Sequence, residues 1–276
     1  GSRPGRPADV SAFPPGSLAG LLLPAGEVHI WFVDLDPPAG RVEALGRSLA
    51  QDEWDRANRF RFDRHRRQYV VGRGALRALL GACTGTRPEL VRFTYGPRGK
   101  PFLAPPFSLS PGTGERAGER GDGINDSGDL FFNLSNSDER ALVGFVRGRE
   151  IGVDIEFLKP MPDCEQIAER FFSESERVVL RGVPQASKEE AFFNCWTRKE
   201  AYLKAVGEGL AAPLDSFDVT LAPGEPPRML TLRGDADAAA RWWLEHFRLS
   251  PEHIGALALE RRDPEERWAV RTWSFE

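Results

Sequence analysis

The sequence predicts an α+β fold of small, mostly antiparallel sheets packed on helices. Along its 276 residues, segments follow the order strand, helices, strands, helices, strands. Runs of β-branched and aromatic residues mark the strands, and apolar residues three to four apart mark the helices. Hydrophobic residues make up 41% and charged residues 28% of the chain, which is typical of a globular protein and excludes the disordered and fibrous classes.

The first half, residues 28–150, follows an N-terminal extension, residues 1–27, whose Gly1-Ser2 start looks like an expression scar. It begins with an apolar strand that ends at Asp36-Pro37-Pro38. Helices and a short alternating strand follow. The predicted elements are strand 28–35, one or two helices over 42–60, helix 66–80, strand 91–95 and turn 96–99.

Residues 105–129 are dense in Gly, Pro and Ser and have almost no apolar content, which predicts a flexible loop. Strand patterns resume directly after it and continue into the second half, residues 151–276. The remaining predicted elements are strands 130–134, 141–146 and 151–157, helices 163–182 and 187–207, strands 217–221, 254–259 and 268–273, and a helix near 238–244.

Composition excludes several classes of protein. No apolar run approaches the ~20 residues that span a bilayer, so we expect no membrane association. Three scattered cysteines indicate a reducing, cytoplasmic compartment, and the lack of a Cys or His cluster argues against zinc. A net charge of −4 argues against nucleic-acid binding.

Basic residues concentrate in the first half. Eight Arg lie between Asp55 and Arg77, against only two Asp. Such a cluster suits phosphates or an acidic partner. The alternative is a solvated, Arg-rich helix face.

Two acidic residues in the segment G-V-D-I-E are candidate metal ligands. Asp154 and Glu156 are two apart on a predicted strand and therefore point to the same face. Adjacent carboxylates repel unless a cation lies between them, and a hard ion prefers oxygen ligands. The alternative is an edge strand with two solvated acids.

A second acidic site lies on the predicted helix 187–207. Trp196, Glu200 and Lys204 are spaced four apart and share one helix face. The alternative is an ordinary solvated pair of Glu200 and Lys204. The basic turn 95–101 could bind a phosphate through its backbone N–H groups, or be a simple hairpin, and residues 135–137 predict a small polar turn.

Taken together, these segments resemble one family. The order Y-G-P-R-G-K-P, F-N-L-S-N-S, G-V-D-I-E, F-F-S-E-S-E and W-T-R-K-E-A-Y-L-K-A-V-G-E-G-L is similar to that of the 4′-phosphopantetheinyl transferases, of the long monomeric kind that activates peptide and polyketide synthases. The resemblance covers residues 28–217. It implies two similar α/β halves in a pseudo-twofold arrangement, with coenzyme A in the cleft between them.

The resemblance also implies roles for individual residues. Asp154, Glu156 and Glu200 would hold Mg²⁺, with Mn²⁺ as an alternative, and Lys204 would contact the coenzyme A phosphates. Arg56 best fits a phosphate-binding place on the early helix, and Arg73 fits it less well. The remaining residues expected to bind coenzyme A are Arg98, Gly99, Lys100, Ser135, Asn136 and Asp154.

Asn136 departs from the family, which usually has His at this position, touching a coenzyme A phosphate. Asn donates a hydrogen bond but carries no charge. The sequence therefore predicts weaker coenzyme A binding with the chemistry retained.

The implied reaction transfers 4′-phosphopantetheine from coenzyme A to a serine of an apo acyl or peptidyl carrier protein and releases 3′,5′-ADP. The catalytic residues would be Glu200 and Lys204, with Glu200 or a metal-bound water taking the serine proton. The Arg cluster offers a docking surface for the acidic helix of a carrier, with Arg64 and Arg66 as its test residues. Two alternatives remain: a Mg²⁺-dependent coenzyme A or nucleotide pyrophosphatase, and a non-catalytic carrier-binding protein.

Overall fold

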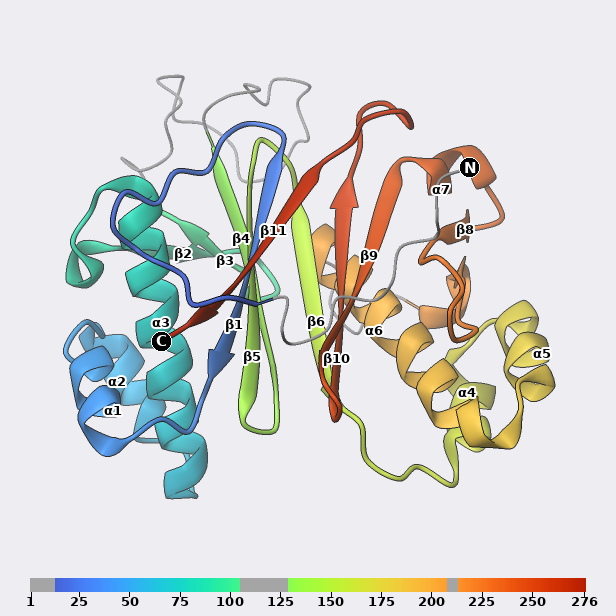
Figure 1. Cartoon of the computed structure of the whole chain (residues 1–276), viewed down its shortest axis with the longest axis horizontal. Helices are drawn as coiled ribbons and strands as arrows, with labels where there is room; N and C mark the ends of the chain where they lie inside the picture. Colours follow the sequence, from blue (N-terminus) through green and yellow to red (C-terminus); the bar gives the residue numbers. More distant parts are fainter. Residues whose placement is uncertain (1–12, 105–128, 208–212) are drawn as a thin grey trace.

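Two β-sheets lie against one another between two groups of helices (Figure 1). The computed structural model describes residues 13–104, 129–207 and 213–276. The start of the expected extension, and all but the last residue of the expected loop 105–129, lie outside the described residues. No helix in the described ranges has the length and apolar character needed to cross a bilayer.

The first sheet has the strand order β11-β1-β5-β4. Pairing is antiparallel except between β1 and β11, which run parallel from the Glu27–Ala269 pair to the Val33–Phe275 pair. The C-terminal strand therefore lies beside the first strand of the chain (Figure 1). The strands are β1 (Glu27–Asp34), β4 (Leu130–Ser137), β5 (Arg140–Arg147) and β11 (Ala269–Phe275).

The second sheet is antiparallel, with the order β6-β10-β9. Two short hairpins accompany the main sheets, one in each half. The strands of the second sheet are β6 (Ile151–Phe157), β9 (Trp242–Ser250) and β10 (His253–Glu260). The hairpins are β2 (Phe93–Tyr95) with β3 (Pro101–Leu103), and β7 (Phe217–Val219) with β8 (Met229–Leu232).

Each sheet is covered on its outer face by its own helices, and this produces three apolar clusters: one under each helix group and one between the sheets. The first group is α1 (Ala39–Gly46), α2 (Gln51–Ala57) and α3 (Asp63–Thr84). The second group is α4 (Cys164–Phe171), α5 (Glu174–Gly182) and α6 (Lys188–Val206), and the short α7 (Ala236–Ala240) precedes β9. Single 3₁₀ turns cover Pro88–Leu90, Gln185–Ser187 and Leu214–Ser216.

The two halves repeat one topology. Each begins with a strand, continues through helices and ends with two strands, the last of which pairs with the first. The sheet orders β1-β5-β4 and β6-β10-β9 are therefore equivalent. The predicted α+β class, with small and mostly antiparallel sheets on helices, is confirmed. The division at residue 150 stays a prediction, and β11 crosses from the second half into the sheet of the first.

Three local predictions were wrong. The helix expected over 163–182 is two helices, because Ser173 and Glu176 form a capping box that starts α5. The helix expected near 238–244 ends at Ala240, and β9 begins at Trp242. Residues 135–137 are the end of β4 and not a turn.

Candidate active site

The carboxylates of β6 lie on the face of the strand that packs against α6, beside the edge strand β4. Asp154 is 3% exposed and Glu156 is half-buried. Gly152 lies two residues before Asp154, on the same face of the strand. It allows α6 to approach, since a Cβ at this position would lie 1.9 Å from the backbone oxygen of Ala201. The G-x-D-x-E pattern thus places its acids where β6 and α6 are closest.

Glu200 and Lys204 enter the same space from α6. Lys204 Nζ lies 2.5 Å from Asp154 Oδ1 and donates a 2.7 Å hydrogen bond to Ser135 Oγ on β4. The Ser135 hydroxyl in turn donates to Asp154 Oδ1 at 3.0 Å. The structure therefore brings together four residues that the sequence identified separately: Asp154, Glu200, Lys204 and Ser135.

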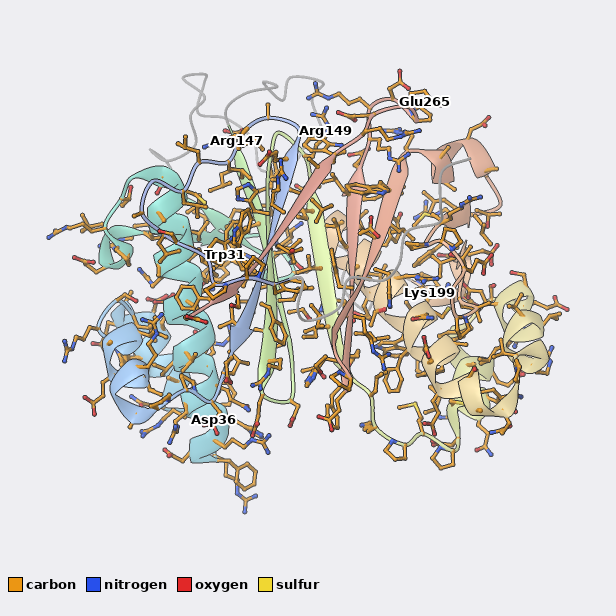
Figure 2. All side chains as sticks on the ribbon, viewed as in Figure 1. Trp31, Asp36, Arg147, Arg149, Lys199 and Glu265 are labelled. Atoms are coloured by element: carbon orange, nitrogen blue, oxygen red, sulfur yellow. The ribbon has the colours of Figure 1, made fainter. Side chains whose placement is uncertain are left out.

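A buried ion pair behind the site fixes α6. Lys199, labelled in Figure 2, has a side chain with 0% exposure and lies 2.9 Å from Glu176 of α5. Its ammonium also donates to the carbonyls of Leu214 and Phe217, so all three of its N–H donors have a partner. Because Lys199 precedes Glu200 directly, this anchor sets the position of the acid.

The acids perturb each other. Burial raises the pKa of Glu156, and the charge of Asp154 raises it further. The same two causes, in the same order, raise the pKa of Glu200, while Lys204 opposes them. Charged carboxylates at this place are poorly solvated and repel one another, and a cation bound between them would relieve both costs.

The donor atoms fit a divalent cation shared with a phosphate ligand. Asp154 Oδ2 and Glu200 Oε1 are buried and have no hydrogen-bond partner in the described part of the chain. Within those same residues, no group of three or more His, Cys, Asp or Glu side chains is arranged so that it could hold a metal ion by itself. Mg²⁺ commonly uses one or two carboxylates and completes its shell with water and substrate phosphate, so these residues fit that ion.

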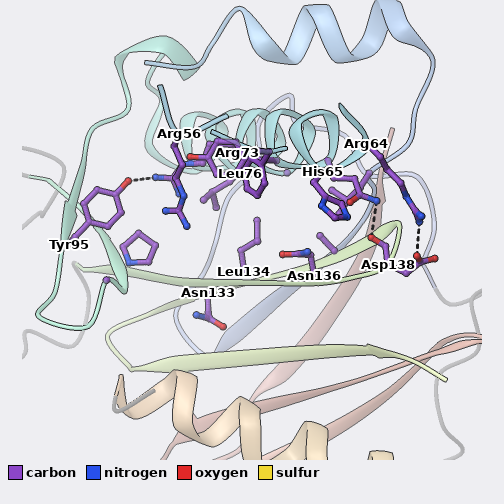
Figure 3. A pocket seen from close by; sticks show the side chains of 18 residues that line it. Arg56, Arg64, His65, Arg73, Leu76, Tyr95, Asn133, Leu134, Asn136 and Asp138 are labelled. Carbon is purple, nitrogen blue, oxygen red and sulfur yellow. Dashed lines mark hydrogen bonds and ion pairs between the residues drawn. The ribbon is translucent and has the colours of Figure 1, made fainter. Parts of the chain in front are cut away.

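A cavity of about 500 Å³ lies on the other side of β4, between this strand and α2 and α3 (Figure 3). Arg56, Gly99 and Asn136, three of the residues expected to bind coenzyme A, line it. Tyr95 of the Y-G-P-R-G-K-P segment also lines the cavity. The other lining residues, which the sequence did not single out, are Phe60, His65, Gln68, Tyr69 and Asp138. They carry no motif of their own, and only the packing of α3 against β4 brings them together.

Two of the guanidinium groups that line the cavity are engaged by carboxylates. Arg73 Nε lies 2.5 Å from the buried Glu53 and its Nη2 donates to Tyr95, while Arg64 pairs with Asp138 at 2.6 Å. Dashed lines in Figure 3 mark the Arg64–Asp138 pair, the Arg73–Tyr95 bond and the bond from Gln68 to the Asp138 carbonyl.

Arg56 differs from both. Within the described ranges it has no carboxylate partner, and its guanidinium lies over the Tyr69 ring, 5.5 Å from the centroid. It is therefore the guanidinium of this wall best placed to bind a phosphate.

Lys100 and Arg98 lie elsewhere. Lys100 Nζ pairs with Glu150 at 2.7 Å and donates to the carbonyl of Ala205 at 2.8 Å, at the end of α6. A cation at this place satisfies a free carbonyl and complements the helix dipole. Arg98 is exposed in the β2–β3 turn, outside the residues that line the cavity. Their expected contacts with a nucleotide stay predictions.

Comparison with known proteins identifies the family. Residues 150–260 match the model of the 4′-phosphopantetheinyl transferase superfamily. The chain is 42% identical over 211 residues to the 4′-phosphopantetheinyl transferase HetI of Nostoc sp. strain PCC 7120, covering 76% of this chain and 81% of that protein. The chain belongs to the 4′-phosphopantetheinyl transferase superfamily.

Further relatives of this transferase come from Bacillus subtilis. A 4′-phosphopantetheinyl transferase of that species is 29% identical over 196 residues, which cover 70% of this chain and 77% of the relative. The transferase Sfp of strain 168 is 39% identical over 98 residues, 36% of this chain and 42% of Sfp. The segment matched by the superfamily model contains β6 and α6, and with them the three acids and Lys204.

Proposed function

We propose that this chain transfers the 4′-phosphopantetheine group of coenzyme A to a serine hydroxyl of an apo carrier protein, releasing 3′,5′-ADP. The activity follows from its membership of the superfamily. The observation that supports the assignment of residues is the convergence of Asp154, Glu200 and Lys204 on one side of β4, with the Arg56 cavity on the other.

The cavity suits the nucleotide part of coenzyme A. Arg56 supplies a positive charge, without a carboxylate partner in the described ranges, for a phosphate. Asn136 adds an amide group to the cavity wall, and Gly99 adds backbone with no side chain in the way. Asn136 offers hydrogen bonds only, because its amide carries no charge. This supports the expectation that coenzyme A binds less tightly than it would with His at the same place.

The residues between β6 and α6 suit phosphoryl transfer. Lys204 is directed by Ser135 and Asp154 and stabilises negative charge that builds on the phosphate oxygens. Glu200 accepts the proton of the attacking serine, and a raised pKa makes it a better base near neutral pH. Mg²⁺, held by Asp154, Glu156 and Glu200, would supply charge neutralisation and orientation of the pyrophosphate.

The rival functions use the same residues differently. A pyrophosphatase would deliver water to the phosphate and release free phosphopantetheine without a carrier. A non-catalytic carrier-binding protein would have no need of a buried cluster of acids beside Lys204. We also propose a cytoplasmic location, which rests on three scattered cysteines that form no disulfide among the described residues.

The decisive experiment incubates the purified protein with Mg²⁺, coenzyme A and a panel of apo carriers, and weighs each carrier by mass spectrometry. The expected result is a gain of one phosphopantetheine on the serine, abolished by EDTA and by Lys204→Ala but not by Lys159→Ala, which removes an exposed lysine. Coenzyme A binding with no mass gain on any carrier would overturn the proposed reaction.

A further inference from the structure

The two sheets are joined at the site by side chains and not by a strand ladder. β4 and β6 are edge strands of different sheets and share no backbone pairing. Instead, Asn133 Oδ1 on β4 accepts a 2.9 Å hydrogen bond from the Val153 N–H on β6. Two positions along, Ser135 Oγ donates to Asp154 at 3.0 Å. Alternate residues of β4 point to one face, so the next member of this series is Ser137.

Ser137 makes the third link, and it makes two bonds. Its hydroxyl accepts a 3.0 Å hydrogen bond from the Phe157 N–H and donates a 2.9 Å bond to Glu156 Oε2. Because a hydroxyl carries one proton, the bond from Phe157 leaves that proton free to point at the carboxylate. The orientation of the Glu156 side chain is thus set by β4 and not by its own strand.

Without the hydroxyl, the Glu156 carboxylate would lose both its direction and the hydrogen-bond donor that holds its Oε2 atom.

We propose that Ser137 is a positioning residue that holds Glu156 in the direction needed to bind a divalent cation together with Asp154. The proposal rests on the proposed function, since it concerns the cation that the transferase would use. Groups that orient metal-binding carboxylates typically change metal affinity about 10–100-fold when they are removed. The metal dependence is therefore the property that Ser137 controls, more than the overall stability.

Two variants of nearly equal shape separate the hydroxyl from packing. Ser137→Thr keeps the hydroxyl and Ser137→Val replaces it by a methyl, and both are β-branched residues suited to a strand. Ser137→Ala serves as a second variant without the hydroxyl. The matched control is Ser48→Ala, which removes a hydroxyl bonded to the Leu45 carbonyl in the first helix group.

Two readouts are measured on the full chain: the Mg²⁺ concentration that gives half-maximal transfer, and the affinity for Mn²⁺ by electron paramagnetic resonance with coenzyme A and no carrier. We expect Ser137→Val and Ser137→Ala to weaken both about tenfold, and Ser137→Thr and Ser48→Ala to stay within twofold of the unmodified protein.

Each other result is decisive. A lower melting temperature in Ser137→Val with unchanged metal dependence would show a purely structural role and overturn the inference, as would equal losses in Ser137→Thr and Ser137→Val. An unmodified protein that transfers phosphopantetheine without binding Mn²⁺ would overturn the inference and leave the proposed reaction standing. A protein that neither transfers nor binds would overturn both.

Discussion

Replacing Gly152 by alanine should separate β6 from α6. The new Cβ would lie 1.9 Å from the Ala201 oxygen and 2.4 Å from the Ala205 nitrogen, and both are backbone atoms that cannot rotate away. Contacts below 3.0 Å are not tolerated, so the helix and strand must move apart by about 1 Å. Overpacking of this kind costs about 1–3 kcal/mol, occasionally more.

The displacement affects function more than stability, because Glu200 and Lys204 lie on the helix that moves and Asp154 on the strand. Misplacing reacting groups by about 1 Å costs about 10²-fold in rate, so we expect at least that loss in carrier modification. Urea unfolding and intact-mass assays measure the two effects, with Gly40→Ala as a control because its Cβ would contact nothing within 4 Å. Gly152→Ala with near-normal turnover would refute the reasoning.

Four further outcomes are expected. Glu200→Gln should lower turnover by at least about 10²-fold, since it removes both a base and a metal ligand; near-normal activity rejects both roles. Arg56→Ala should raise the KM for coenzyme A about tenfold, because it removes one charge-assisted hydrogen bond to a phosphate. An unchanged KM would show that the phosphate does not bind at Arg56. Asn136→His should lower the coenzyme A KM at constant kcat; an unchanged or higher KM contradicts the role given to this position. His246, whose pKa burial lowers to about 3, stays neutral when folded while the unfolded chain takes up a proton below about 6.5. The free energy of unfolding should therefore fall by up to about 1.4 kcal/mol per pH unit as the pH is lowered from 6.5 to 3. Urea unfolding at several pH values should show a smaller pH dependence of this free energy in His246→Gln. An equal pH dependence in the variant and the unmodified protein would exclude His246 as its cause.

The strands and helices that carry the acids were predictable because each has a strong local signal. The alternating residues of 151–157 and the apolar spacing of 187–207 lie within one residue of β6 and α6. The pairing of β11 with β1 was not predictable, because more than 200 residues separate the two strands and neither sequence segment indicates its partner.

The site was predictable only in part for the same reason. Asp154, Glu156, Glu200 and Lys204 lie in recognisable motifs, and the structure places Asp154 and Lys204 in contact. His65 has no such signal, and Ser137 lies in the F-N-L-S-N-S segment but nothing in that segment indicates its bond to Glu156. The place of each residue depends on which strand or helix lies opposite. Lys100 shows the converse: its motif predicted a phosphate contact, whereas a nearby acid and the end of α6 engage it here.

The pairing of β11 with β1 has a consequence for synthesis on the ribosome. Until residues 269–275 have emerged, β1 has a neighbour on only one side, and the Trp31 ring lacks Trp273, which stacks on it at 5.2 Å. An apolar edge strand left open is a template for association with other chains. The first half of this transferase therefore emerges early but stays vulnerable to aggregation until residues 269–275 have left the ribosome, and a nascent chain stalled before residue 269 should need a chaperone most.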